Sequence, residues 1–324
     1  MGARVSGRVA PGRATKPDLD LTMLARALRR VLLIELIVYI AFGWGLVHDA
    51  GWTTLAAGTF VLGFALAIRA LGIALTFALA ERYAGAKPPG NRIGFAGWLR
   101  TYFAELGAYI ALYTLLQPFE ALFTRAQRPC PPAQARLPVL LLHGYICNRG
   151  FMLPLQRFFE RHGLTTFSHN LEPVYAGIDS YCDGLARRIE EICAATGAGK
   201  VVILGHSMGG LAARAYLRQH GAARVATLIT LGTPHHGTAL ARLGAGENAS
   251  QMVPGSAWLR LLNQHPIAIP AVSVFSHQDN IVSPRDSAAL AGAKLVELYG
   301  IGHLTMAFSR RVREIALREI NAVS

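Results

Sequence analysis

Two long apolar segments lie near the start of the chain, separated by a short polar turn at residues 48–51. The first, residues 31–47, contains a single charged residue, Glu35, and the second, residues 52–80, contains only Arg69. A helix needs about 20 apolar residues to cross a bilayer, so the pattern predicts an α-helical membrane hairpin. Charged residues inside such a hairpin are expected to pair with each other or to face protein.

Basic residues on both sides of the hairpin predict its orientation. Lysine and arginine are frequent before residue 31 and after residue 81, and the turn between the segments has none. Because positive charge is retained on the cytoplasmic side, both ends should be cytoplasmic. A third apolar stretch, residues 106–116, is too short to cross and should form an interfacial or core-packed helix. If it did cross, the rest of the chain would lie in the periplasm.

From residue 138 onward, short runs of β-branched residues and leucine alternate with helical patterns. Residues 178–193 and 304–320 repeat apolar residues every three or four positions, as a helix that faces a sheet does. Continuous apolar strands between such helices are typical of a mostly parallel sheet covered on both faces. The expected strands are residues 139–142, 165–168, 201–204, 225–231, 271–275 and 294–298.

These patterns divide the chain into four parts. A basic tail, residues 1–30, precedes membrane-associated helices over residues 31–126, whose spans are the two apolar segments. A proline-rich linker, residues 127–137, leads to a catalytic domain, residues 138–324. The predicted fold class is therefore α/β, preceded by an α-helical membrane hairpin.

The composition fits a chain that is partly in a membrane. Hydrophobic residues make up 52% and charged residues 16%, and the mean hydropathy is +0.33, which excludes a disordered chain. The net charge of +13 is spread along the chain without a basic stripe interleaved with aromatics, so no nucleic-acid partner is expected. Four cysteines without a CxxC pair exclude a disulfide scaffold and give no zinc motif; whether Cys130 and Cys147 are bridged stays open.

The candidate chemistry is concentrated in Gly205-His206-Ser207-Met208-Gly209, which follows an expected buried strand and precedes an expected helix. A serine on a sharp strand-to-helix turn exposes its hydroxyl, and the flanking glycines are needed because neighbouring backbones leave no room for a side chain. Ser207 is therefore the candidate nucleophile.

A serine hydroxyl becomes a good nucleophile when a histidine accepts its proton and a carboxylate orients that histidine. His303 lies between the last expected strand and the last helix, which makes it the candidate base. Asp279, in the loop after strand 271–275, is the candidate acid. Asp286 is the rival acid, although its place after Pro284 at the expected start of a helix suits a cap.

The oxyanion of the tetrahedral intermediate needs preorganised backbone donors. One candidate is the amide of Met208, directly after the nucleophile. The other is the amide of Tyr145, in the loop after the first strand of the domain, where Gly144 lets the backbone turn inward.

Three segments together resemble the α/β-hydrolase fold and, within it, the bacterial triacylglycerol lipases and related esterases. They are Leu-Leu-His-Gly-Tyr (141–145), Gly-His-Ser-Met-Gly-Gly (205–210) and Thr-Pro-His-His-Gly-Thr (233–238), followed by the candidate acid and base in the order Ser, Asp, His. The resemblance covers residues 138–324 and implies that segment 233–238 lines the floor of the site, with His235 and His236 structural. The expected substrate-binding positions are His143, Gly144, His206 and Thr233.

Secreted members of that family bind calcium through an aspartate shortly after the catalytic histidine, and no acid closely follows His303. No calcium, other metal or cofactor is therefore expected. The lid region, residues 239–269, is short, and its apolar residues can line an acyl pocket, touch the bilayer or belong to the core. These residues are Leu240, Leu243, Met252, Val253, Trp258, Leu259, Leu261 and Leu262.

The sequence thus predicts a membrane-anchored serine hydrolase, a lipase or esterase, that cleaves carboxylic esters of lipid-like substrates. It is expected in the bacterial inner membrane with the catalytic domain in the cytoplasm, and its partners are a lipid or ester substrate and the membrane. Two alternatives stay open: an acyltransferase that uses the same triad, and a non-catalytic membrane protein that binds a lipid or a partner. Acyl chain length, head group and oligomeric state also stay open.

Overall fold

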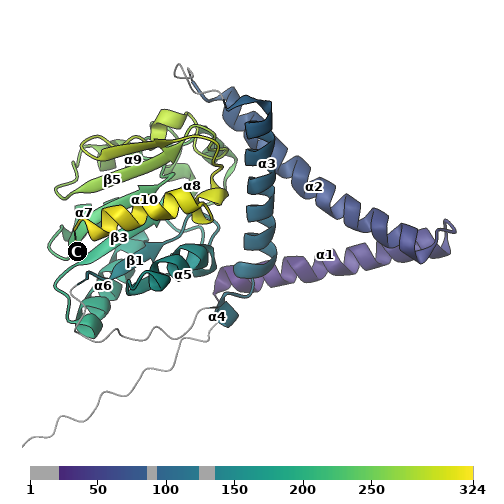
Figure 1. The fold of residues 1–324 in the computed structure, drawn as a ribbon, viewed down its shortest axis with the longest axis horizontal. Helices are drawn as coiled ribbons and strands as arrows, with labels where there is room; N and C mark the ends of the chain where they lie inside the picture. Colours follow the sequence, from purple (N-terminus) through teal and green to yellow (C-terminus); the bar gives the residue numbers. More distant parts are fainter. Residues whose placement is uncertain (1–21, 86–92, 124–135, 324) are drawn as a thin grey trace, which may run out of the picture.

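The computed structural model describes residues 22–85, 93–123 and 136–323. Three long helices from the first part of the chain stand beside an α/β domain formed by residues 136–323 (Figure 1). A short helix, α4 (Glu120–Phe123), follows the long ones. Cys130, the N-terminal tail up to residue 21 and most of the predicted linker lie outside the described residues, and Cys147, Cys182 and Cys193 are free and buried.

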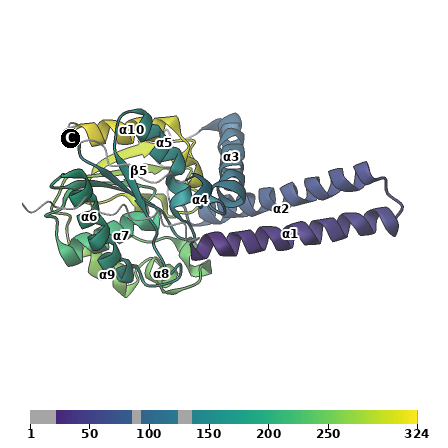
Figure 2. The ribbon, with the colours of Figure 1, turned by 90° about the horizontal axis from the view of Figure 1, so that it is seen from below.

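Helices α1 (Met23–His48) and α2 (Thr54–Arg82) project away from the α/β domain (Figure 2). They meet at their outer ends and diverge toward the domain (Figure 1). At roughly 1.5 Å per residue they are about 39 Å and 44 Å long. Their most apolar stretches have mean hydropathies of 2.0 and 2.1, with 0% and 6% of those residues buried, so length and composition allow both to cross a membrane. Glu35 pairs with Arg69 at 2.5 Å, one of the two arrangements predicted for these charges.

Helix α1 begins at Met23, well before the apolar segment that predicts it. The hydroxyl of Thr22 caps the helix by accepting a hydrogen bond from the amide of Ala25 at 3.2 Å. Arg29 donates to the carbonyl oxygen of Pro118 at 2.6 Å and lies over the ring of Phe119. This turn therefore contacts protein at the base of the hairpin, and the helix extends into the predicted basic tail.

Helix α3 (Gly94–Ile110) stands against the α/β domain (Figure 1) and continues as a π-helical segment, η1 (Ala111–Leu116). Its buried residues Thr101, Glu105 and Ala108, together with Leu112 of η1, follow helical spacing along one face. Ala108 and Leu112 join the core of the α/β domain. The third apolar stretch is predicted to be either interfacial or core-packed, and in the structure it is packed against the core.

Six strands form one parallel sheet in the order β2-β1-β3-β4-β5-β6. This confirms the predicted parallel α/β class. In a parallel sheet all strands end at the same edge, so loops that are distant in sequence meet there. The strands are β1 (Val139–Leu142), β2 (Thr166–His169), β3 (Val201–His206), β4 (Val225–Leu231), β5 (Ala271–Ser276) and β6 (Lys294–Leu298).

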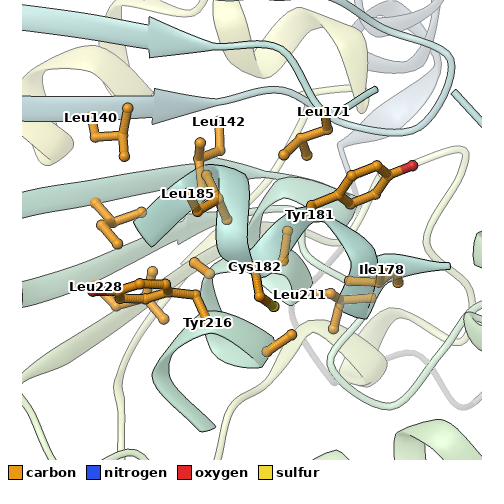
Figure 3. Packing of buried hydrophobic residues seen from close by; sticks show 14 of the residues in the cluster. Leu140, Leu142, Leu171, Ile178, Tyr181, Cys182, Leu185, Leu211, Tyr216 and Leu228 are labelled. Carbon is orange, nitrogen blue, oxygen red and sulfur yellow. The ribbon is translucent and has the colours of Figure 1, made fainter. Parts of the chain in front are cut away.

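Alternate residues of each strand face opposite sides of the sheet, which gives the domain two core layers. Leu140 and Leu142 pack with residues of α6 (Cys182–Thr196) and α7 (Met208–His220) on one face (Figure 3). Val139 and Leu141 pack with α5 (Leu153–Arg161) and α10 (Arg310–Asn321) on the other. Burial on both faces explains why β1, and β3 as far as Leu204, are continuously apolar instead of alternating.

Candidate active site

Ser207 occupies the turn between β3 and α7, at the edge of the sheet where the strands end. Its backbone has φ 54° and ψ −128°, a conformation that residues with a side chain rarely adopt. Such strain persists when the surrounding structure fixes it, and it is concentrated at functional sites. The strand–turn–helix context predicted for Ser207 is therefore present, together with backbone strain.

Close backbone approach explains the glycines around Ser207. A Cβ atom at Gly205 would lie 2.5 Å from the amide nitrogen of Gly210, and one at Gly209 would lie 2.5 Å from the carbonyl oxygen of Leu142. Backbone atoms in a close-packed interior cannot move aside for an added methyl group. The turn that presents Ser207 can therefore form only with glycine at these two positions.

His303, in the loop after β6, meets Asp279, in the loop after β5. Nδ1 of His303 lies 2.8 Å from Oδ2 of Asp279, and both residues are buried. Oδ1 of Asp279 accepts hydrogen bonds from the amides of Ile281 and Val282, each at 2.8 Å. Because the carboxylate accepts the Nδ1 proton, Nε2 is left as the basic nitrogen of the imidazole.

The pKa of His303 is set by opposing effects. Burial acts to lower it, but the charge and hydrogen bond of Asp279 and the charge of Glu105 outweigh burial, so the pKa is raised from its ordinary value. The imidazole is therefore neutral, and able to accept a proton, only above that raised pKa.

The other acids and histidines of these segments lie elsewhere. Asp286 is exposed in the short helix η5 (Arg285–Ala288), so Asp279 is the acid that the structure brings to His303. Nδ1 of His235 lies 3.4 Å from the guanidinium of Arg214, and burial holds the pKa of His235 well below its usual range. His236 is exposed. These contacts agree with structural roles for His235 and His236.

His206 links Ser207 to the His303 loop. Its Nε2 donates to the carbonyl oxygen of His303 at 3.0 Å, and the two ring centroids lie 4.6 Å apart. The His206 ring also stacks on Phe151 at 4.3 Å. Burial, with the nearby charge of His303, holds the pKa of His206 well below its usual range, so this ring is neutral. The His206 side chain therefore supports the loop that carries His303.

Thr233 and His143 bind backbone groups around Ser207. The hydroxyl of Thr233 donates to the carbonyl oxygen of Ser207 at 2.9 Å. Nε2 of His143 accepts from the amide of Leu171 at 3.0 Å, and Nδ1 donates to the carbonyl oxygen of Gly144 at 3.0 Å. Burial lowers the pKa of His143 to about 4. Both ring nitrogens are thus engaged, and His143 holds the loop that passes Ser207.

The loop after β1 passes directly beside Ser207. A Cβ atom at Gly144 would lie 2.8 Å from Cβ and 3.3 Å from Oγ of Ser207, so only glycine fits there. Tyr145 follows Gly144, and Met208 begins α7, where the first amides of a helix have no partner within the helix. The two amides predicted to hold the oxyanion therefore belong to backbone that adjoins Ser207.

The predicted lid region, residues 239–269, forms the short helices η4 (Ala239–Leu243), α8 (Glu247–Gln251) and α9 (Ala257–Asn263). The hydroxyl of Tyr145 donates to the carbonyl oxygen of Ala245 at 2.7 Å and accepts from its amide at 2.9 Å, which fixes this segment beside the loop after β1. Leu243 is 74% exposed. Most of the other apolar residues belong to or pack against the core, namely Met252, Val253, Trp258, Leu259 and Leu262.

The N-terminal helices contact the loops that carry Asp279 and His303, a contact that no pattern in the sequence predicts. Asn280 donates to the hydroxyl of Thr76 on α2 at 2.8 Å and accepts from the amide of His303 at 3.0 Å. The hydroxyl of Ser283 donates to a carbonyl oxygen of α2, that of Ala80, at 2.7 Å. The C-terminal end of α2 therefore lies at the same edge of the sheet as Ser207.

The arrangement is chemically suited to acyl transfer. A strained serine, a histidine paired with a carboxylate and nearby backbone amides are the parts needed to form and break an acyl-enzyme. Within residues 22–85, 93–123 and 136–323, no three His, Cys, Asp or Glu side chains are grouped so that they could hold a metal ion.

Comparison with known proteins gives related sequences and a related fold. A family model described as alpha/beta hydrolase fold matches residues 138–255. Triacylglycerol lipases of Pseudarthrobacter phenanthrenivorans and Burkholderia plantarii are each 33% identical over 117 residues, or 34% of this chain and 36% and 32% of theirs. The matched part thus spans about a third of those relatives.

A solved structure extends the likeness to the three-dimensional fold. The mature lipase BlEst2 of Bacillus licheniformis is similar with a TM-score of 0.54 and 17% identity, over 61% of this chain and 96% of that one. Together with the order and direction of the six strands, this shows that the chain has an α/β-hydrolase fold.

Proposed function

We propose that this chain, an α/β-hydrolase fold with triacylglycerol lipases among its relatives, is a membrane-anchored serine hydrolase that cleaves carboxylic esters of lipid-like substrates. The observation that carries the proposal is the buried pair of His303 and Asp279, 2.8 Å apart, at the sheet edge where strained Ser207 lies. The His206 bond to the His303 carbonyl supports it, because it ties the base to the residue before the nucleophile.

In the first half of the reaction, Oγ of Ser207 attacks the ester carbonyl carbon while Nε2 of His303 takes the hydroxyl proton. The carbonyl electrons move to the oxygen, where the amides of Tyr145 and Met208 donate to the oxyanion. Asp279 stabilises the imidazolium that forms, through its bond to Nδ1. Collapse of the intermediate expels the alcohol, which takes the proton from Nε2, and leaves an acyl-enzyme.

In the second half, Nε2 of His303 takes a proton from water as the water oxygen attacks the acyl carbon. Collapse of this second intermediate returns the proton to Oγ of Ser207 and releases the carboxylic acid. Both halves need neutral His303, so kcat/KM should rise with pH through the raised pKa of this residue.

The position of the helices supports a membrane-bound substrate. Helices α1 and α2 expose apolar side chains along their length, and an apolar helix that meets no protein is stable in lipid. The C-terminal end of α2 is bonded to the loop that carries Asp279, so the site should lie near the bilayer surface. The basic residues on both sides of the hairpin favour a cytoplasmic position for this side of it.

The test is replacement of the nucleophile in the full chain, purified in detergent or nanodiscs. Ser207→Ala should abolish hydrolysis of p-nitrophenyl esters and labelling by a fluorophosphonate. Ser250→Ala, which removes the hydroxyl of an exposed serine, is the matched control and should keep both. Full turnover by Ser207→Ala would refute the proposal, and product analysis with an added alcohol acceptor separates hydrolysis from acyl transfer.

A further inference from the structure

Glu105 is an acid without a role in the proposed reaction, and it is fully buried. It lies on α3, outside the α/β domain, on the face that packs against the loop after β6. Burial of a carboxylate destabilises the fold unless hydrogen bonds satisfy its oxygens. The hydrogen-bond partners of Glu105 therefore indicate its role.

The partners of Glu105 are the two residues that follow His303. Oε1 accepts from the amide of Leu304 at 2.8 Å, and Oε2 accepts from the amide and the hydroxyl of Thr305 at 2.9 and 2.7 Å. Burial raises the pKa of Glu105, and these hydrogen bonds act in the opposite direction, because all three groups are donors and favour the ionised carboxylate. A side chain at Gly302, the residue before His303, would collide with the same carboxylate. Glu105 therefore contacts the chain on both sides of His303.

Side chains that belong to, or are bonded to, the N-terminal helices accept the hydrogen bonds of the amides of residues 303–305. The amide of His303 donates to Asn280, whose own side chain donates to Thr76 on α2, and the next two amides donate to Glu105 on α3. The short helix that begins at Leu304 is thus capped by an acid from another part of the fold.

We propose that Glu105 is a positioning residue for His303: its carboxylate fixes the loop on which the imidazole stands and so links helix α3 to the reactive site. The inference rests on the proposed serine-hydrolase function. It predicts that the geometry of the base depends on a helix outside the α/β domain.

Glu105 also acts on His303 through its charge. The titratable groups that face His303 are Asp279 after β5, Glu105 on α3 and His206 at the end of β3. The charges of Asp279 and Glu105 both favour the imidazolium, whereas His206 is neutral. Removal of the Glu105 charge should therefore lower the pKa of His303 and move the acid limb of kcat/KM to lower pH.

The experiment compares Glu105→Gln with wild type in the full chain. Gln keeps the volume and can still accept from Leu304, but its Nε2 would meet two donors of Thr305. We expect kcat to fall roughly tenfold to a hundredfold with little change in KM, the range for a displaced catalytic group, together with the shift of the acid limb. Glu120→Gln is the matched control, because Glu120 is a buried acid on α4 that pairs with Arg149.

Thr305→Val provides a second variant that leaves Glu105 in place and removes one of its three donors. It should lower kcat by a smaller factor, and its effect should be non-additive with that of Glu105→Gln. Thermal unfolding of each variant gives the folded fraction, to which activities are normalised.

The outcomes separate the two proposals. If Ser207→Ala is inactive while Glu105→Gln keeps the wild-type kcat and acid limb, the role of Glu105 is refuted and the hydrolase function stands. The role of Glu105 is also refuted if Glu120→Gln lowers kcat as much as Glu105→Gln does, or if the activity of Glu105→Gln falls only in proportion to its folded fraction. If Ser207→Ala retains turnover, the hydrolase function falls and the role of Glu105 falls with it.

Discussion

Replacement of Asp279 by Asn changes one atom at the centre of the proposed site. In the native structure Oδ1 of Asp279 accepts from two backbone amides, and Oδ2 faces Nδ1 of His303. In Asp279→Asn the side-chain oxygen must stay with the two amides, because an NH2 group there would face two donors. The NH2 group then points at His303 and donates to Nδ1. The imidazole proton is forced to Nε2, which can no longer accept the proton of Ser207.

The magnitude follows from the distance and the burial. At 2.8 Å, the attraction between imidazolium and carboxylate is about 6 kcal/mol at an effective dielectric constant of about 20. If the transition state loses about two thirds of this attraction, kcat falls about a thousandfold. The His303 tautomer that carries its proton on Nε2 lowers kcat further. We therefore expect kcat to fall by about 10³ to 10⁴, with KM little changed.

The assay is hydrolysis of a p-nitrophenyl ester by the full chain over a range of pH, with circular dichroism to verify folding. The residual activity of Asp279→Asn should have its acid limb at lower pH, because the carboxylate that raises the pKa of His303 is gone. Asp286→Asn is the control, since Asp286 is exposed, and should stay near wild type. A folded Asp279→Asn within tenfold of wild type, or an equal loss in Asp286→Asn, would refute the assignment of the acid.

Two further predictions concern the turn and the buried histidines. Gly209→Ala should inactivate the enzyme and lower the free energy of unfolding by about 1–3 kcal/mol, because the added methyl group meets the carbonyl oxygen of Leu142; Gly199→Ala, where a Cβ has open space, should change neither property. Stability should fall as pH drops from about 6.5 toward 4, because the unfolded chain protonates His143 first, whereas its folded pKa is about 4. The contribution is on the order of 3 kcal/mol, His206 and His235 act in the same direction, and His303, with its raised pKa, opposes them. Denaturant unfolding at several pH values measures this loss, which should shrink in His143→Gln; a flat profile in wild type would contradict the reasoning.

Much of the fold follows from local pattern. The predicted runs 139–142 and 225–231 match β1 and β4 residue for residue, because a strand buried on both faces is rich in apolar and β-branched residues. The glycine pattern around Ser207 also predicts its turn, although only Gly205 is required by backbone nearby in sequence, at Gly210; Gly209 is required by Leu142, which belongs to another strand. Several boundaries differ from the prediction. α1 starts at Met23, where Arg29 contacts Pro118 and Phe119. β2 is shifted by one residue, to 166–169, and β3 and β5 extend to residues 206 and 276.

The acid and the supports of the base depend on packing between segments far apart in the chain. Asp279 and Asp286 lie close together in sequence, and although the place of Asp286 suits a helix cap, the pattern leaves it as a rival acid. The meeting of the loops after β5 and β6 brings Asp279 to His303. Glu105 precedes the third apolar stretch as an isolated acid, and nothing in its neighbourhood along the chain shows that it binds residues 304 and 305.

The amino-acid sequence by itself determined the parallel α/β class, the apolar helices and the turn at Ser207, because each is predicted by residue types and their spacing along the chain. Only the tertiary structure decided which acid meets His303, which side chains hold its loop and where the hairpin is attached. Those contacts join residues up to about two hundred positions apart, and hydrogen bonds and charges act through space, whatever the separation along the chain.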